Sequence, residues 1–223
     1  MKRTRLSDRQ LPNYTRGEEI FNSVSHIVGA GFGVIALIAC LAVSILHGNS
    51  WGIVGSAIYG GSLIVLYTMS SIYHGLPACT GKKVMQVIDH CAVYLLIAGT
   101  YTPILFTAVR RVSPVWCWVL FTIVWGLTVT ATVFTAIDLK RYSVLSMVCY
   151  IGMGWCIVLA GRTIVDALSL PGLLWLVAGG VSYTVGAALY GVGKKHRWMH
   201  SVFHLFVVAG SIMQFICIIG YVI

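Results

Sequence analysis

Two pairs of polar side chains at helical spacing are the part of this sequence best suited to chemistry. His200 and His204 are four residues apart, and so are Ser70 and His74. Residues four apart lie on the same face of an α-helix, so His200 and His204 can bind one metal ion together. Asp89 falls inside an apolar run, and we expect it to be the one buried acid. The other acids fall in the N-terminal tail or in connections: Asp8, Glu18, Glu19, Asp138 and Asp166.

The elements that carry these residues are predicted to be membrane-spanning helices. The chain has 223 residues, of which 58% are hydrophobic and only 9% are charged. A helix needs about 20 apolar residues to cross a bilayer, and the sequence contains seven apolar runs of about that length. We therefore predict an all-α, polytopic membrane protein with a seven-helix bundle. The predicted spans are residues 20–46, 53–73, 84–107, 114–134, 143–160, 173–192 and 198–223, after a basic cytoplasmic tail at residues 1–19.

The distribution of lysine and arginine predicts the orientation of the bundle. One side of the predicted topology carries twelve of the 15 basic residues, namely Lys2, Arg3, Arg5, Arg9, Arg16, Lys82, Lys83, Lys140, Arg141, Lys194, Lys195 and Arg197. The other side carries Arg110, Arg111 and Arg162. Because basic residues collect on the cytoplasmic side, we expect the N-terminus inside and the C-terminus outside. The same rule explains the net charge of +9 without nucleic-acid binding, so we expect no nucleic-acid partner.

This topology places the polar side chains at one depth. His74, Asp89, His200 and His204 all fall within about two helical turns of the cytoplasmic face. Three imidazoles with one open position form a catalytic zinc site, in which the metal activates a water molecule. We therefore expect zinc, bound by His74, His200 and His204. Asp89 would orient the water or act as the general base, and Ser70 would donate a hydrogen bond at the site.

Ordinary structural roles compete with each of these assignments. A histidine pair at helical spacing is often two interfacial side chains that bind lipid headgroups, and a lone serine such as Ser70 often bonds its own helix backbone. His26 and His90 are candidates for supporting the metal ligands, but we expect them to lie at the membrane interface instead. His47 and His196 are excluded from the site because one lies on the outer side and the other in a basic loop.

Four ordered motifs resemble those of the hemolysin III family, which belongs to the group of progestin and adiponectin receptor-like (PAQR) proteins and is remotely similar to alkaline ceramidases. The motifs are Glu19-Ile-Phe-Asn22-Ser-Val-Ser-His26, Ser70-Ser-Ile-Tyr-His74, Asp89-His-Cys-Ala-Val-Tyr-Leu-Leu-Ile-Ala-Gly-Thr-Tyr-Thr-Pro103 and His200-Ser-Val-Phe-His204. The resemblance covers nearly the whole chain.

The resemblance implies seven helices with the N-terminus inside, and zinc bound by the three matching histidines. It also implies that Asp89 contacts the zinc-bound water and that Ser70 belongs to the site. One departure from the pattern is Gln214, ten residues after His204, where many relatives carry histidine. This departure leaves the three predicted ligands unaffected.

Several functions fit this site. We expect a zinc-dependent hydrolase of lipid amides or esters, acting at the cytoplasmic leaflet in membrane-lipid homeostasis, with a membrane lipid as substrate. A membrane sensor with structural zinc is the alternative. A cytolysin, as the family name suggests, fits less well, because so apolar a chain cannot travel in soluble form. A transporter is disfavoured because the polar groups gather at one end of the helices and not at the midplane. The sequence leaves the oligomeric state open.

Overall fold

The protein folds as a bundle of seven long helical spans. The structure is a computed structural model that describes residues 4–6, 8–192 and 196–223. In that part of the chain seven helices are long and apolar enough to cross a membrane, as predicted. They are α1 (Arg16–Leu46), α2 (Ser50–Gly75), α3 with its continuation (Thr80–Val112), α5 (Pro114–Ile137), α6 with its continuation (Ser143–Ala160), α8 (Leu170–Val192) and α9 (Met199–Tyr221). Together with its family relationship below, this makes the chain a multi-pass protein of the cell membrane.

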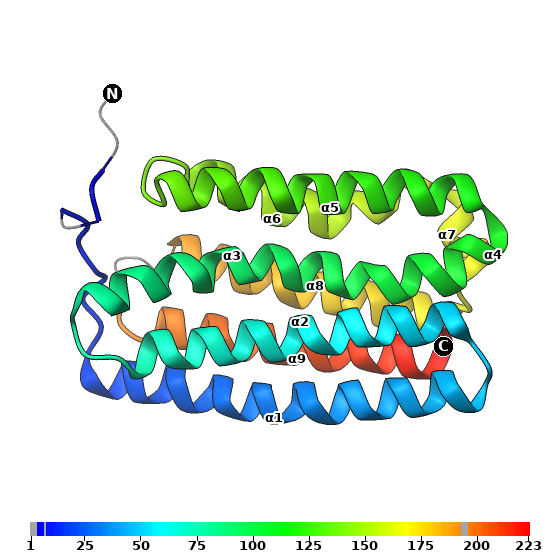
Figure 1. Ribbon diagram of the computed structural model, residues 1–223, viewed down its shortest axis with the longest axis horizontal. Coiled ribbons are helices and arrows are strands. Elements are labelled where there is room, and N and C mark those ends of the chain that lie inside the picture. Colours follow the sequence, from blue (N-terminus) through cyan, green and yellow to red (C-terminus); the bar gives the residue numbers. More distant parts are fainter. Residues whose placement is uncertain (1–3, 7, 193–195) are drawn as a thin grey trace.

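The two ends of the bundle differ in charge. The described part of the N-terminal segment, the α2–α3 and α5–α6 connections, the last turn of α8 and the first turn of α9 gather at one end, and the C-terminus lies at the other (Figure 1). We call the first of these the basic end. Its described basic residues are Arg5, Arg9, Arg16, Lys82, Lys83, Lys140, Arg141 and Arg197. Lys2, Arg3, Lys194 and Lys195, which the charge count also used, lie outside the described residues. The cytoplasmic location of the basic end stays a prediction.

Side-chain caps extend the helices beyond the apolar runs. Thr15 and Glu18 form a capping box, in which the Thr15 hydroxyl accepts from the Glu18 backbone N–H while the Glu18 carboxylate accepts from the Thr15 backbone N–H. This motif satisfies backbone groups that the first helical turn leaves free, so α1 begins at Arg16, four residues before the expected span. Asn49 caps α2 in the same manner, by accepting from the Gly52 backbone N–H. Glu18 and Glu19 therefore belong to a helix and not to a tail.

The first helix turns its small and polar residues inward and its apolar residues outward. Its buried residues recur every three or four positions and are Glu18, Asn22, His26, Gly29, Gly33, Ala36, Cys40 and Ser44. Large apolar side chains such as Ile27, Val28 and Ile35 are exposed on the opposite face. In lipid, small residues let helices approach closely while apolar ones face the acyl chains. This pattern places the polar stripe of α1 against the interior of the bundle.

Close helix contacts depend on glycine at two crossings. A Cβ at Gly60 of α2 would lie 2.5 Å from Leu37 Cβ of α1, and a Cβ at Gly55 would lie 2.6 Å from Pro103 Cα of α3. Both distances are shorter than real carbon contacts, so the close approach of α2 to α1 and to α3 requires glycine at these positions. Helix α9 in turn packs against α1 and α8. The last turn of α2 and the first turns of α9 therefore both meet the N-terminal part of α1.

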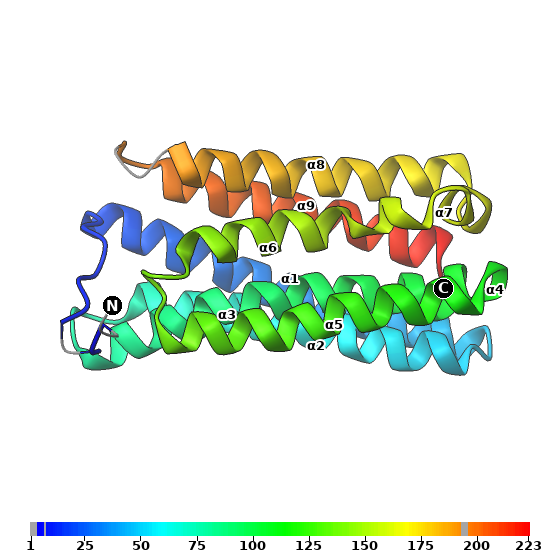
Figure 2. The same cartoon turned by 90° about the horizontal axis from the view of Figure 1, so that it is seen from above.

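Two spans are interrupted by irregular turns towards the end of the bundle opposite the basic end. Helix α3 (Thr80–Pro103) continues through the π-helical segment η1 (Ile104–Val109) into α4 (Arg110–Val112). Helix α6 (Ser143–Trp155) tightens into the 3₁₀ turn η2 (Cys156–Ala160), and the short helix α7 (Arg162–Ala167) follows after Gly161. In the view of Figure 2, α6 runs between α8 and α5. The apolar cavity described below passes beside these interruptions.

Candidate metal centre

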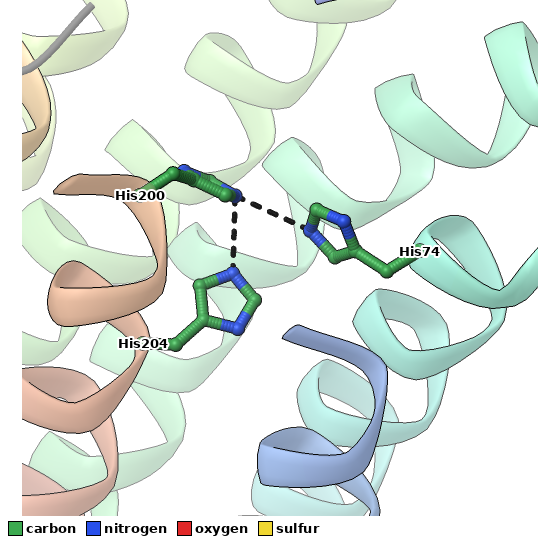
Figure 3. Close-up of side chains that lie close together, drawn as sticks. All are labelled: His74, His200 and His204. Atoms are coloured by element: carbon green, nitrogen blue, oxygen red, sulfur yellow. Dashed lines mark hydrogen bonds between the residues drawn. The ribbon is translucent and has the colours of Figure 1, made fainter. Parts of the chain in front are cut away.

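Three histidines from two helices converge at the basic end. His74 lies in the last turn of α2, and His200 and His204 lie in the first two turns of α9. His200 Nε2 is 3.2 Å from His74 Nε2 and 3.1 Å from His204 Nε2 (Figure 3). One nitrogen from each ring lies within 4.8 Å of the others, and His74 and His204 are buried. The structure thus brings together the three histidines that the sequence predicted as ligands.

The spacing of these nitrogens suits a metal ion. Ligands at 2.0–2.1 Å from a tetrahedral zinc ion lie about 3.3 Å from one another, close to the two distances observed. Hydrogen bonds alone would leave the cluster incompletely satisfied. A neutral imidazole nitrogen carries either one proton or one lone pair, so His200 Nε2 can bond one neighbour but not both. The group can therefore bind a metal, and its geometry fits a small divalent ion with nitrogen preference.

Glu19 fixes the orientation of the first ligand. Its Oε2 lies 2.6 Å from His74 Nδ1, and its Oε1 accepts a hydrogen bond from Lys82 Nζ at 2.6 Å. A carboxylate only accepts, so His74 carries its proton on Nδ1 and directs the Nε2 lone pair into the site. Lys82 also donates to the Leu76 carbonyl at 2.9 Å, which holds the α2–α3 connection over the pair. Metal-binding histidines commonly have this arrangement, in which a carboxylate such as Glu19 holds one ring nitrogen and the other nitrogen faces the metal site.

The expectation that Asp89 is the one buried acid is wrong. Glu18 is 4% exposed and Asp138 is 2% exposed, compared with 9% for Asp89. Glu18 Oε1 accepts from the backbone N–H of Trp198 at 2.6 Å and so joins the start of α1 to the start of α9. These carboxylates could be buried because backbone N–H groups at helix ends and turns satisfy them. The sequence predicts burial only for an acid that falls inside an apolar run. These two acids lie at the ends of such runs, so their burial was not predicted.

Asp138 holds the N-terminal segment against the bundle. Its Oδ2 accepts from the Thr4 backbone N–H at 2.8 Å, and its Oδ1 accepts from those of Lys140 and Arg141 at 3.2 and 3.1 Å. These bonds, first of all the one from Thr4, lower the pKa of Asp138 to about 2. The carboxylate is therefore charged throughout the neutral range, and it anchors the segment at the α5–α6 connection.

Aromatic rings enclose the histidine cluster on two sides. Tyr14 of the N-terminal segment stacks on His200, with ring centroids 4.9 Å apart and planes 15° apart. His26 of α1 stacks on His204 at 3.8 Å and 20°. His26 is 3% exposed, which corrects the expectation that it lies at the membrane interface; it supports a predicted ligand instead. Burial also raises the pKa of Tyr14 well above its usual value, so this ring stays neutral.

A cavity of about 220 Å³ continues from the cluster into the apolar interior. Ser70, Asp89, His90, His200 and His204 line its end at the histidines. Asp89 is not among the groups within 4.8 Å of all three ligand nitrogens, so it faces the site from the cavity. His90 is partly buried at 22% side-chain exposure, and its Nδ1 lies 2.8 Å from the Gln86 carbonyl oxygen, within its own helix.

The rest of the cavity is long and mostly apolar. Along α3 and into the start of η1 its lining runs from Asp89 to Ile104, a separation of fifteen positions or about 22 Å of helix. Val158 of η2 and Val177 of α8 line it and are also 62% and 41% exposed. At these two residues the wall of the cavity is therefore also part of the surface that faces lipid. A chain entering from the membrane could reach the histidines without crossing the basic end.

The fold and this site define a class: a seven-helix membrane protein with a buried three-histidine site at one end of an apolar cavity. Comparison with known proteins places the chain more closely. The model of the family described as haemolysin-III related matches residues 14–215. The chain belongs to this family.

Individual relatives agree with that placement. The chain is 37% identical to "Hemolysin-3" of Bacillus cereus over 92% of both chains. It is 35% identical to "Hemolysin-3 homolog" of Bacillus subtilis (strain 168), over 93% of this chain and 96% of the relative. A more distant relative is the human "Monocyte to macrophage differentiation factor", 22% identical over 84% of this chain and 79% of its own length. This relative supports the wider relation to PAQR-type proteins.

Sequence reasoning missed Glu19, Asn22 and Tyr14. Asn22 is fully buried, and neither polar atom of its side chain has a hydrogen-bond partner among the described residues. The spacing of Glu19, Asn22 and His26 by three and four residues is helical, and the capping box at Thr15 starts the helix early enough to include them. Tyr14 gave no comparable signal, because it lies outside a helix and reaches the site only through the tertiary fold.

Proposed function

We propose that the protein is a zinc-dependent hydrolase of membrane-lipid amides or esters, acting in membrane-lipid homeostasis. The observation that carries this proposal is the continuity between the three-histidine cluster and the apolar cavity. A lipid carbonyl held at the histidines would leave its acyl chain in the cavity. The chain would enter from the bilayer where Val158 and Val177 both line the cavity and face outward. A ligand site sealed from lipid would have argued against this function.

The choice of zinc and of a catalytic role rests on the ligand set. Among the described residues, the group that can hold a metal consists of three histidines without a carboxylate or thiolate. Structural zinc sites normally have four protein ligands, whereas catalytic sites have three and an open position. When bound, zinc would polarise the carbonyl and lower the pKa of a coordinated water.

The surrounding side chains have roles that follow from their positions. Asp89 lines the cavity beside the ligands, where it can accept a proton from the attacking water and return it to the leaving group. Ser70, one turn before His74, can donate a hydrogen bond to the carbonyl oxygen as charge develops on it. Glu19 keeps His74 in the tautomer that binds metal, and the Tyr14 ring separates His200 from bulk water.

The basic end is proposed to face the cytoplasm, which places the reaction at the inner leaflet. The support is the excess of lysine and arginine at that end, which normally marks cytoplasmic connections. The cluster lies within about two helical turns of this face, near the depth of lipid ester and amide groups. The acyl chain of the substrate would then lie in the apolar part of the cavity, which runs from the histidines into the bundle.

A membrane sensor with structural metal is the second candidate. The observation in its favour is that the groups around the cluster join three helices: Glu19 of α1 binds His74 of α2, and Glu18 of α1 binds the start of α9. A metal there would hold the helices together without chemistry. A cytolysin, as the printed names of the bacterial relatives suggest for those proteins, has less support, because every span exposes large apolar side chains that need a membrane around them.

The first test is metal content together with hydrolysis. Detergent-purified protein is expected to hold about one zinc per chain, and a His200→Ala/His204→Ala variant to lose it, while the exposed His47→Ala control retains it. In vesicles made from a bacterial total lipid extract, the native protein should release free fatty acid, measured by mass spectrometry. Asp89→Asn should keep zinc but lose the release. Zinc retention with no fatty-acid release from any lipid class would refute the hydrolase and favour the sensor.

A further inference from the structure

Gln214 of α9 presents an unused hydrogen-bond acceptor in the apolar part of the cavity. The residue is 4% exposed and lines the cavity. Its Nε2 donates to the Leu176 carbonyl of α8 at 3.0 Å, while its Oε1 has no hydrogen-bond partner among the described residues. The Leu176 bond also fixes which atom is oxygen, because a flipped amide would set oxygen against oxygen.

The other polar side chains in this half of the cavity are already bonded. Tyr101 donates to the Gly154 carbonyl and accepts from the Ile157 backbone N–H. Thr184 donates to the Gly180 carbonyl and accepts from Trp155 Nε1. Tyr183 and Ser211 bond each other. Away from the histidine end, where His26, His200 and His204 also have unpartnered nitrogens, the Gln214 oxygen is thus the unpartnered polar atom among the described lining residues.

A buried acceptor of this kind selects for a donor. Leaving a buried polar group without a partner is unfavourable, so a ligand that brings a hydroxyl to this point is favoured over one that brings only methylene groups. The backbone that positions the amide is tight: a Cβ at Gly179 would lie 2.5 Å from Gln214 Nε2. The side chain therefore has a defined place from which to discriminate between ligands.

The position of Gln214 relative to the histidines sets where the hydroxyl must lie. Gln214 follows His204 by ten residues on the same straight helix, a rise of about 15 Å. An extended chain advances roughly 1.2 Å per bond, since three backbone bonds span at most about 3.6 Å per residue. A chain whose carbonyl lies at the histidines therefore passes Gln214 about twelve bonds further along.

We propose that the cavity is a binding site for acyl chains that carry a hydroxyl group near carbons 12 and 13, with Gln214 Oε1 as its acceptor. This inference rests on the proposed function for the placement of the carbonyl at the histidines. It adds a substrate class to that function, namely lipids with a mid-chain hydroxylated acyl group. The selection itself is a property of binding and needs no turnover.

The test compares fatty acids that differ only in the hydroxyl. Binding of 12-hydroxyoctadecanoic, 2-hydroxyoctadecanoic and octadecanoic acid to the detergent-purified full chain is measured by competition against a fluorescent fatty acid. A net hydrogen bond of about 0.5–1.5 kcal/mol predicts that the 12-hydroxy acid binds about 2- to 13-fold more tightly than the unsubstituted acid. The 2-hydroxy acid should show no such gain from Gln214.

Three variants assign the preference to this residue. Gln214→Leu keeps the apolar volume but removes the acceptor, so the preference for the 12-hydroxy acid should disappear while octadecanoic acid binds as before. Gly179→Ala displaces the amide and should weaken the preference. Gln86→Leu is the matched control, because Gln86 is also buried with an unpartnered Oε1 but does not line the cavity. Thermal unfolding of each variant checks that it is folded.

The outcomes separate this inference from the proposed function. Equal binding of the three acids by the native protein, or no binding of any of them, overturns the inference. A preference that survives Gln214→Leu overturns it as well. If the preference is found and depends on Gln214 but no lipid is hydrolysed, the binding site stands and the hydrolase fails. If lipid is hydrolysed but no preference for the hydroxylated chain is found, the hydrolase stands and the inference about Gln214 fails.

Discussion

Replacing Glu19 by glutamine should weaken metal binding although Glu19 contacts no metal itself. In the native protein the two carboxylate oxygens accept from two different donors, His74 Nδ1 and Lys82 Nζ, both at 2.6 Å. Glutamine has one acceptor oxygen, and its NH₂ group would face a second donor. One of the two bonds must therefore be lost, whichever way the amide is turned.

The size of the effect follows from what the lost bond does. If His74 loses its acceptor, its Nδ1–H tautomer is no longer favoured and the ring is less basic towards metal. Removing such a supporting carboxylate typically costs 10- to 100-fold in metal affinity, or about 1.4–2.7 kcal/mol. Because Glu19 keeps 20% of its side chain exposed, water can replace part of the bond, so we expect the lower half of this range.

Competition with a chromophoric zinc chelator measures the affinity directly. Glu18→Gln is the matched control: it is the adjacent residue and is buried, but it bonds Thr15 and Trp198 and no histidine. We expect Glu18→Gln to lower the thermal unfolding temperature without changing zinc affinity. If Glu19→Gln binds zinc as tightly as the native protein, or if both variants lose affinity equally, the argument that Glu19 orients a ligand is refuted.

Three further predictions concern the N-terminal segment and the orientation. Tyr14→Ala removes the ring stacked on His200 and should increase the rate at which a chelator extracts metal; an unchanged rate would show that the ring does not limit access. Cys79 is the exposed cysteine of the α2–α3 connection, so a membrane-impermeant maleimide should label it in inverted vesicles and not in intact cells, and labelling from outside would reverse the proposed orientation. The pKa of Asp138 is lowered to about 2, so its bonds to the segment are fully present above pH 4 and are lost as the pH falls through 2. Asp138→Asn should therefore release Thr4 at neutral pH, measured as faster amide exchange there than in the native protein.

The number and type of elements could be predicted because lipid imposes a simple rule. Each crossing needs about 20 apolar residues and must satisfy its backbone internally, so the seven apolar runs of the sequence indicate seven helices. The ends of the helices were less accessible to this reasoning. Hydropathy locates the first residue of an apolar run, which predicted a span from residue 20. Helix α1 instead begins at Arg16, directly after the capping residue Thr15. For this reason Glu19 was predicted to lie in the N-terminal tail, whereas it lies in α1 and contacts His74.

The histidine cluster could be predicted because two independent constraints agree. The spacing of four residues places His200 and His204 on one face of a helix, and the topology places His74 at the same depth in the membrane. These two constraints together predict that the three rings lie close to one another. The cavity could not be predicted in this way. Its shape depends on how α6 and η2 lie relative to α8, and the 3₁₀ turn that interrupts the fifth span gives no clear signal in the sequence. Gln214 therefore had no assigned role until its neighbours were known.

The depth of the histidines and the length of the cavity together bear on the choice among membrane functions. A transporter that alternates between two sides needs its binding groups near the midplane, where both sides can reach them. Here the ionisable groups lie at the basic end, and the interior beyond them holds neutral polar groups and apolar side chains. Such a division suits a ligand with one reactive polar end and one long apolar end, because each part then meets the surroundings that cost it least. In the proposed hydrolase such a ligand is a lipid that enters sideways, and we expect the entry near Val158 and Val177, which line the cavity and are also exposed.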